Sequence, residues 1–345
     1  MVPFAGYEMP LRYRSETEEH LNVRNGVGVF DVSHMGEFIL RGPGALNLIQ
    51  KLCSNDAARL SPGKAQYSCL PNDSGGIVDD LLVYMLRENE YMLVVNASNI
   101  EKDWNWIRER NDEGVIMENI SDQVSLIAVQ GPKAIDVLRK LTDVDLDAIP
   151  YYSFVKGNLL NITGGAIISA TGYTGAGGYE LYVYNEYACQ VWDALFEAGA
   201  DSGILPAGLG ARDTLRLEMG YCLYGNEIDD NTSPIEAGLG WITKFNKDFT
   251  NSEQLHAQKE QGPQKKLVGF EMLEKGIPRH DYIIYSADGR TIGRVTSGTM
   301  SPCLQTGIGL GYIETAHASP GTEVRVDVRG KSLMARVKNL PFYKP

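Results

Sequence analysis

Several short stretches within residues 34–96 alternate apolar and polar positions with the period of a β-strand. Residues 35–42, "MGEFILRG", change face at every position, and residues 65–71 and 76–84 flank the turn-forming sequence "NDSGG". The run "YMLVVN" at 91–96 follows a second polar turn, "RENE". These patterns predict an antiparallel meander.

Other stretches have apolar residues at helical spacing. "GALNLIQKLC" (44–53) predicts a helix, and Ile100, Trp104 and Ile107 would share one face of another. Ser98 and Glu101 have the spacing of a capping box at its start. Strands are predicted at 125–131 and within 166–184. Further helices are predicted at 132–141, 185–199 and 206–221. The alternation indicates an α+β fold with mixed sheets.

The pattern changes at about residue 265. From there on, short strands are separated by Gly, Pro and Asp-Gly turns, as in "DYIIYS", "GIGLGYI" and "TEVRVDV". This region predicts a small all-β domain. The polar stretch 246–264 is predicted to be its connection to the rest of the chain.

Composition narrows the class of protein. The 345 residues allow two or three domains, and 43% hydrophobic with 22% charged residues is typical of a soluble globular protein. No apolar run is long enough to cross a bilayer, so no membrane partner is expected. The net charge of −12 disfavours binding to nucleic acid, whose phosphates it would repel.

Familiar cofactor motifs are missing from the sequence. The five cysteines are scattered, which argues against a disulfide framework or a thiolate zinc site and favours a reducing compartment. The five histidines do not have metal-site spacing, and we interpret His34 as structural. No glycine cluster fits a dinucleotide or P-loop motif. We therefore expect neither a metal nor a nucleotide cofactor.

Two adjacent carboxylates interrupt an apolar run. In "GGIVDDLLVY" (75–84), strand alternation places Asp79 and Asp80 on opposite faces, each among apolar neighbours. A buried carboxylate is costly unless it is hydrogen-bonded or paired. One aspartate can therefore be structural while the other has a chemical role.

A second set of residues has similar character. Glu180 lies inside a predicted strand, and Arg212 lies at a helix start rich in glycine and alanine. Aromatic residues stand near these charges in sequence: Tyr67, Tyr84 and Tyr173. Such a set suits a flat heterocycle, with a carboxylate for its donor edge and an arginine for its acceptor edge.

Ten motifs in order carry a family resemblance. Together they resemble the aminomethyltransferases, the T-proteins of the glycine cleavage system. The similarity extends over essentially the whole chain, from near residue 2 to "LPFYKP". The motifs are "DVSHMGEF" (31–38), "GKAQYS" (63–68), "GGIVDDLLVY" (75–84), "LVVNASNIEKD" (93–103), "AVQGPKA" (128–134), "TGYTG" (171–175), "GGYEL" (177–181), "PAGLGARDTLRLE" (206–218), "LYGNEI" (223–228) and "VTSGTMSP" (295–302).

The resemblance implies a three-domain, cloverleaf-like ring around a folate channel. Two related α+β domains would be followed by a barrel-like all-β domain. The expected divisions are 1–45 with 140–245, then 46–139, then 265–345, with 246–264 as the connection. The implied reaction moves a one-carbon unit from the aminomethylated lipoyl arm of H-protein to tetrahydrofolate and releases ammonia.

The resemblance also assigns residues. Asp80 falls at the catalytic aspartate, which would accept a hydrogen bond or a proton from folate N10 and stabilise an iminium-like cation. Asp79 would then be the structural member of the pair. Glu180 and Arg212 match folate contacts, and the implied channel lining is Met35, Tyr67, Tyr84, Asn96 and Tyr173.

The chain departs from the family pattern in two places. Ala176 and Gly177 stand where an acidic pair is common, which changes the charge expected near the channel mouth. Relatives also usually carry a segment before "FAGYEMP", and without it a helix near the H-protein contact would be shorter.

Other functions fit parts of the sequence. A folate-dependent demethylase of a free methylated substrate and a non-catalytic folate-binding regulator are the alternatives, and the presence of Asp80 argues against the regulator. An iron–sulfur assembly factor of the same superfamily would carry a Lys-Gly-Cys motif, which "LYGNEI" lacks. We expect a cytoplasmic location, or the mitochondrial matrix for a processed protein.

Overall fold

The computed structural model describes residues 1–344, which form two compact units. Unit 1 contains residues 1–68 and 80–212, and unit 2 contains residues 69–79 and 213–344. Within residues 1–344, no helix has both the length and the apolar character needed to cross a membrane. The predicted division into three domains stays a prediction.

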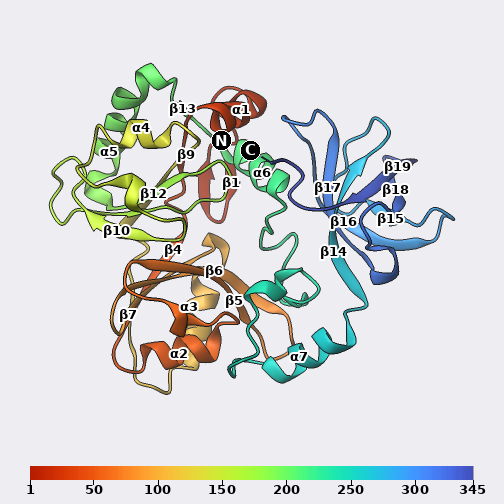
Figure 1. Cartoon of the computed structure of the whole chain (residues 1–345), viewed down its shortest axis with the longest axis horizontal. Helices are drawn as coiled ribbons and strands as arrows, with labels where there is room; N and C mark the ends of the chain where they lie inside the picture. The colour runs from red at the N-terminus through yellow and green to blue at the C-terminus, as the bar shows by residue number, and fades with distance from the viewer. Residues whose placement is uncertain (345) are drawn as a thin grey trace. The chain divides into compact units, whose positions relative to one another are not determined.

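A six-stranded sheet forms one layer of unit 1 (Figure 1). Its neighbours are antiparallel except for the parallel pair β13–β3. The strand order is β10 (Phe154–Gly157), β11 (Ala166–Ser169), β12 (Gly178–Tyr184), β9 (Val124–Gln130), β3 (Gly28–Asp31) and β13 (Leu205–Pro206). This order places β12, which carries Glu180, next to the centre of the sheet.

Two helices pack against this sheet. α4 (Ala134–Leu138) and α5 (Asn185–Gly199) contact each other and β12, and Figure 1 shows them together on one side of it. Val129, Leu181 and Leu195 belong to the core between these layers and are completely buried. α4 is shorter than the helix predicted for 132–141.

A second sheet contains the predicted meander. Its strand order is β5 (Lys64–Pro71), β6 (Ile77–Arg87), β7 (Glu90–Val95), β4 (Gly36–Arg41) and β8 (Ile116–Asn119). β6 pairs antiparallel with β7, and β7 pairs antiparallel with β4. The meander prediction is confirmed. Helices α2 (Ala45–Leu52) and α3 (Ile100–Glu109) are also present where predicted.

The predicted capping box of α3 is wrong. Asn99 occupies the N-cap position and makes no side-chain capping bond, while Ser98 lies in the preceding 3₁₀ turn, Ala97–Asn99. The turn places Ser98 one residue too early to cap the helix. The predicted apolar face does form, because Ile107 is completely buried and Trp104 packs edge-on against Phe38 with 5.2 Å between ring centroids.

Several elements have no clear sequence pattern. Helix α1 (Glu16–Asn25) buries mainly polar residues, including Glu19 and His20. The others are β1 (Val2–Phe4), β2 (Tyr7–Met9) and the 3₁₀ turns Ala57–Arg59, Leu146–Ala148, Ala200–Ser202, Leu239–Ile242 and Thr315–His317. Helix α6 (Leu209–Met219), in contrast, lies within the helix predicted for 206–221.

A closed six-stranded barrel forms the C-terminal part of unit 2. Its order is β14 (Lys265–Met272), β17 (Gly307–Glu314), β16 (Thr291–Met300), β15 (Ile283–Tyr285), β18 (Glu323–Val328) and β19 (Lys331–Lys338). β14 pairs with both β17 and β19, which closes the barrel. Phe270, Ile284 and Val326 are fully buried in its core. The prediction of an α+β protein with a C-terminal all-β domain is confirmed.

The stretch predicted as a polar connection contains a helix, α7 (Ser252–Gln261). Only Leu255 of this helix is buried. A helix with one apolar contact residue has no periodic apolar pattern, which explains why the sequence did not indicate it.

The turn between β5 and β6 belongs to unit 2 and contacts the segment around residue 230. The Ile77 N–H donates to the Asp229 carbonyl at 2.9 Å, and the Asn72 side chain donates to the Asp230 carbonyl at 2.8 Å. A Cβ atom on Gly76 would lie only 1.9 Å from the Asp230 carbonyl oxygen. Only glycine permits this close approach of two backbones.

Candidate functional site

Asp80 lies on β6, between side chains from the two neighbouring strands. Tyr67 of β5 donates from its hydroxyl to Asp80 Oδ2 at 2.9 Å. Asn96, directly after β7, donates from Nδ2 to Asp80 Oδ1 at 2.8 Å. The strand order β5–β6–β7 thus brings the predicted catalytic residue together with two predicted folate contacts. Each carboxylate oxygen is held by a different donor.

The two adjacent aspartates differ in exposure. Asp79 is completely buried, whereas Asp80 is partly exposed. Strand alternation explains the difference, because neighbouring residues on β6 point to opposite faces. Of the pair, only the Asp80 carboxylate has access to solvent, as expected for a group that meets a ligand.

Glu180 lies on β12 and is buried, with 8% of its surface exposed. Thr171 donates from its hydroxyl to Glu180 Oε2 at 2.5 Å. Burial raises the pKa of Glu180, whereas the Thr171 hydrogen bond and the Arg212 charge oppose this increase. Among residues 1–344, no donor is seen on Glu180 Oε1. This oxygen can therefore accept a hydrogen bond from a ligand.

Arg212, on α6, lies near the same carboxylate. Its guanidinium carbon is 4.9 Å from the centre of the Tyr173 ring, a cation–π geometry. The Arg212 charge acts on Glu180 and also on His34. The structure therefore groups Glu180, Arg212 and Tyr173, as the sequence predicted for a heterocycle site.

His34 is an uncharged neighbour of this group. Burial and the Arg212 charge lower its pKa to about 4, so the ring is neutral at pH 7. Phe4 packs edge-on against it, with 5.4 Å between ring centroids. This environment is consistent with the structural role that the sequence suggested.

Tyr84 shares a face of β6 with Asp80 but lies four residues further along. A strand rises about 3.3 Å per residue, so the two positions are about 13 Å apart. The Tyr84 hydroxyl is 3.2 Å from the hydroxyls of both Ser169 and Thr171, and Thr171 contacts Glu180. The hydroxyls of Tyr84 and Thr171 therefore connect this part of β6 with Glu180.

Two predicted ligand contacts stay predictions. Tyr84 is completely buried, and Met35 is half-buried in the turn between β3 and β4.

Sequence reasoning missed several polar residues near Glu180. They are Ser169, Thr171 and Tyr182, all at least 96% buried. A signal was present for one of them, because Tyr182 follows Glu180 by two positions in a strand and must share its face. Ser169 and Thr171 lie before "GYTG" and give no comparable signal.

A buried ion pair in unit 2 connects two of the sequence motifs. Arg216 Nη1 donates to Glu227 Oε2 at 2.8 Å, and Arg216 is 1% exposed while Glu227 is fully buried. Arg216 Nη2 also donates to Ser297, and Thr296 donates to Glu227 Oε1 at 2.6 Å. "LYGNEI" and "VTSGTMSP" are thus held together by one network around a charge pair.

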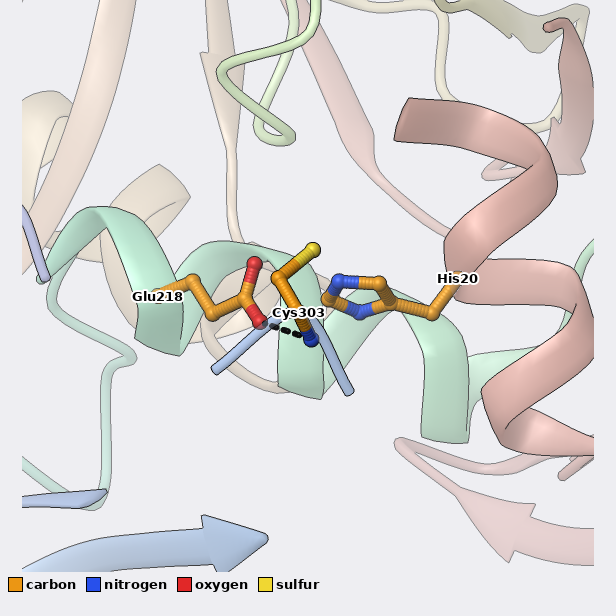
Figure 2. A group of neighbouring side chains, drawn as sticks. All are labelled: His20, Glu218 and Cys303. Carbon is orange, nitrogen blue, oxygen red and sulfur yellow. Dashed lines mark hydrogen bonds between the residues drawn. The ribbon is translucent and has the colours of Figure 1, made fainter. Parts of the chain in front are cut away.

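Glu218 supports a neighbouring turn of unit 2. Its Oε1 atom accepts a hydrogen bond from the Cys303 backbone N–H at 3.2 Å (Figure 2). The same oxygen accepts a hydrogen bond from the Ser301 hydroxyl at 2.5 Å. The Glu218 carbonyl accepts from the Phe342 N–H at 2.9 Å. One buried residue of α6 therefore fixes both the end of the "VTSGTMSP" motif and the C-terminal segment.

Comparison with protein families matches nearly the whole chain. Residues 1–247 match the family model described as the GCVT N-terminal domain, and residues 265–344 match the glycine cleavage T-protein C-terminal barrel domain. The second match coincides with the closed barrel.

Full-length relatives are similarly close. The chain is 60% identical over 344 residues to an aminomethyltransferase of Flavobacterium psychrophilum, covering 100% of this chain and 95% of that protein. It is 60% identical over 346 residues to an aminomethyltransferase of Bacteroides fragilis, covering 100% and 96%. A solved structure of the glycine cleavage system aminomethyltransferase T from Bartonella henselae superimposes with a TM-score of 0.92, at 32% identity and with 99% and 93% coverage.

Proposed function

Because the chain belongs to the glycine cleavage T-protein family, we propose that it is the aminomethyltransferase that moves a one-carbon unit from H-protein to tetrahydrofolate. The observation that carries this proposal at the site is the Asp80 carboxylate, partly exposed and held by Tyr67 and Asn96. The demethylase and the regulator are not favoured, because close full-length relatives carry the name aminomethyltransferase.

The proposed reaction balances without an added oxidant or reductant. The methylene carbon starts with bonds to the lipoyl sulfur and to an amino nitrogen. It ends with bonds to N5 and N10 of tetrahydrofolate. The two protons released from N5 and N10 finish on the thiolate and on the departing ammonia.

Asp80 is the proposed catalytic residue. Its carboxylate would accept a hydrogen bond or the proton from folate N10, which makes that nitrogen a better nucleophile. The same negative charge would stabilise the iminium-like cation formed when a leaving group departs. Tyr67 and Asn96 would hold the carboxylate in one orientation, so that little reorganisation is needed during the reaction.

Glu180 and Arg212 are proposed to bind the pterin end. A pterin presents an N–H and an amino group side by side, which a carboxylate can accept together. Arg212 would donate to the acceptor edge, and Tyr173 would contribute an aromatic wall. The separation of about 13 Å between the Asp80 and Tyr84 positions on β6 supports a ligand bound lengthwise along this face.

H-protein is the proposed protein partner, since the lipoyl arm must deliver the aminomethyl group. We place the reaction in the cytoplasm, because the relatives compared above are bacterial. We propose that neither a metal nor a nucleotide cofactor takes part.

Turnover with aminomethyl-loaded H-protein and tetrahydrofolate tests the proposal. Ammonia and methylenetetrahydrofolate should appear in equal amounts with the wild type. Asp80→Asn should reduce the rate about 10²- to 10⁴-fold while tetrahydrofolate still binds. Asp73→Asn is the matched control, because it removes an exposed carboxylate from the turn between β5 and β6.

Two results would contradict the proposal. Full activity of Asp80→Asn would remove Asp80 from the catalytic role. A wild-type protein that binds tetrahydrofolate but makes no product from loaded H-protein would favour the demethylase.

A further inference from the structure

Four hydroxyl groups in unit 1 form a hydrogen-bonded cluster that contacts Glu180 through Thr171. Tyr182 donates to the Tyr84 hydroxyl at 3.0 Å. Tyr84 Oη is 3.2 Å from both Ser169 Oγ and Thr171 Oγ1. The Ser169 and Thr171 hydroxyl oxygens are 2.9 Å apart, and Thr171 contacts Glu180 Oε2 at 2.5 Å. We call Tyr182, Tyr84, Ser169 and Thr171 the hydroxyl chain.

Counting protons gives the hydroxyl chain a direction. Each hydroxyl has one proton to donate, and an ionised carboxylate can only accept. The carboxylate attracts the Thr171 proton more strongly than a neutral hydroxyl does. Thr171 Oγ1 has donor geometry toward both Ser169 Oγ and Glu180 Oε2, and its single proton goes to the stronger acceptor, the carboxylate. Tyr182 donates to Tyr84, and Tyr84 can donate to Thr171, whose own proton is used on Glu180, so the protons of these three hydroxyls point toward the carboxylate.

Water does not compete with these bonds. Tyr84 and Ser169 are completely buried, and Thr171 and Tyr182 are 3% and 4% exposed. Tyr84 comes from β6, whereas Tyr182 and Ser169 come from β12 and β11 in the other sheet. The hydroxyl chain therefore joins the two sheets of unit 1 through hydrogen bonds in a medium of low dielectric, where each bond strengthens the next.

The hydrogen bond that Thr171 donates is one of the few contacts that favour the ionised form of Glu180. Burial raises its pKa, and the two groups that oppose this are the Thr171 hydroxyl and the Arg212 guanidinium. The Glu180 charge in turn affects Tyr84 and Tyr182, whose pKa values burial raises, so both remain protonated donors at pH 7. Glu37, near Tyr182, is neutral at pH 7 because burial raises its pKa to about 9. Glu37 therefore adds no negative charge near the Tyr182 end of the hydroxyl chain.

We propose that the hydroxyl chain keeps Glu180 ionised and fixes its carboxylate for the folate ring, which makes Tyr84 and Tyr182 positioning residues of the ligand site. The inference rests on the proposed role of Glu180. It assigns the buried tyrosines an effect without ligand contact, since they act through Thr171. Thr171 occupies Oε2, which leaves Oε1 to accept from the ligand.

The pH dependence of tetrahydrofolate binding tests this role. In Tyr84→Phe and Tyr182→Phe, the dissociation constant measured by calorimetry should stay within about twofold of wild type at pH 8.5. At pH 6 it should be about 3- to 10-fold weaker, as expected from the loss of part of one hydrogen bond. Thr171→Val should show a larger shift, and Thr171→Ser should restore wild-type behaviour because it keeps the hydroxyl.

Tyr179→Phe is the matched control. Tyr179 also lies on β12, is buried, and donates from its hydroxyl to the Leu146 carbonyl at 2.9 Å, away from Glu180. It loses the same atoms as Tyr182→Phe but leaves the hydroxyl chain intact. Equal pH profiles for the three Tyr→Phe variants would overturn the inference. A weakening of equal size at pH 6 and pH 8.5 would also overturn it, because that pattern indicates direct contact or packing.

A second measurement separates this inference from the proposed function. Carboxyl infrared difference spectra of the ligand-free protein against Glu180→Gln report the protonation of Glu180 directly. If Glu180 becomes protonated at a higher pH in Tyr84→Phe than in wild type, the result supports the proposed role of the hydroxyl chain. It does so even if tetrahydrofolate does not bind and the proposed function fails. An unchanged midpoint for the protonation of Glu180 would contradict the proposed role of the hydroxyl chain, even if folate binds.

Discussion

The Tyr67 hydroxyl donates to Asp80 Oδ2 at 2.9 Å, so a residue predicted to line a ligand channel also holds the proposed catalytic carboxylate. Tyr67→Phe should lower kcat about 10- to 100-fold, the usual effect of losing one hydrogen bond to a charged group. The dissociation constant of tetrahydrofolate should change little. Single-turnover kinetics with loaded H-protein measure the first quantity, and calorimetry measures the second.

Tyr184→Phe is the control for Tyr67→Phe, because Tyr184 is 49% exposed. If Tyr67→Phe weakened tetrahydrofolate binding and left kcat unchanged, Tyr67 would be a ligand contact and not a positioning residue for Asp80.

Breaking the buried ion pair of Arg216 and Glu227 should reduce the free energy of unfolding strongly. Arg216→Met leaves a buried carboxylate without its cation, and such changes typically reduce the free energy of unfolding by about 3–5 kcal/mol. The double variant Arg216→Met/Glu227→Met should lose less than the sum of the single variants. Urea unfolding measures all three.

A surface pair calibrates this measurement. Arg336 and Glu323 are 2.9 Å apart, with side chains 44% and 48% exposed. Arg336→Met should therefore cost only about 0–1 kcal/mol. A similar loss for the buried and exposed pairs would show that the network around Glu227 is not the source of stability.

Gly76→Ala should destabilise unit 2. The new methyl group would lie 1.9 Å from the Asp230 carbonyl, and neither backbone can move without breaking the bond between Ile77 and Asp229. We expect a loss of about 1–3 kcal/mol, as for overpacked sites. Gly240→Ala is the matched control, because a Cβ atom there meets nothing within 4 Å. Equal unfolding midpoints for the two variants would contradict the close approach.

Glu37 should make stability fall as pH rises. Both of its carboxylate oxygens are buried without a hydrogen-bond partner among the described residues, and burial raises its pKa from 4.5 to about 9. Between these values the folded protein keeps a proton that the unfolded chain has released. Unfolding free energy therefore decreases with rising pH by up to about 1.4 kcal/mol per pH unit from this group.

Glu37→Gln should remove this slope, because glutamine does not titrate. Urea unfolding at several pH values between 5 and 9 compares it with wild type and with Glu118→Gln, which removes an exposed carboxylate from β8. A difference between Glu37→Gln and wild type that stays constant with pH would show that Glu37 is already ionised in the folded protein.

Local patterns predicted most of the strands but not every helix. Alternation and turn residues indicated β4 to β7 and the barrel strands, since each has one buried face or a buried core. Helix α1 was missed because it buries Glu19 and His20 as well as Val23, so its buried face has no periodic apolar pattern. Helix α7 was missed because Leu255 is its single buried residue.

The site was predictable as a set of residues, but its contacts were not. Asp80, Glu180 and Arg212 stood out as charges in apolar or glycine-rich surroundings. That Tyr67 and Asn96 bind Asp80 depends on the pairing of β6 with its neighbours. Ser169 and Thr171 are ordinary residues for a strand and a turn, so only the fold reveals that they lead from Tyr84 to Glu180.

The closure of the barrel also sets the order of events during synthesis. Gly269 of β14 pairs with Lys338 of β19, so the first strand of the barrel waits for the sixth to leave the ribosome. Until then, β14 and β18 each present an edge of unpaired N–H and C=O groups, which other chains can join. Ribosomes stalled before residue 331 should therefore carry a barrel that is open and prone to aggregate, while unit 1 residues up to 212 have already been made.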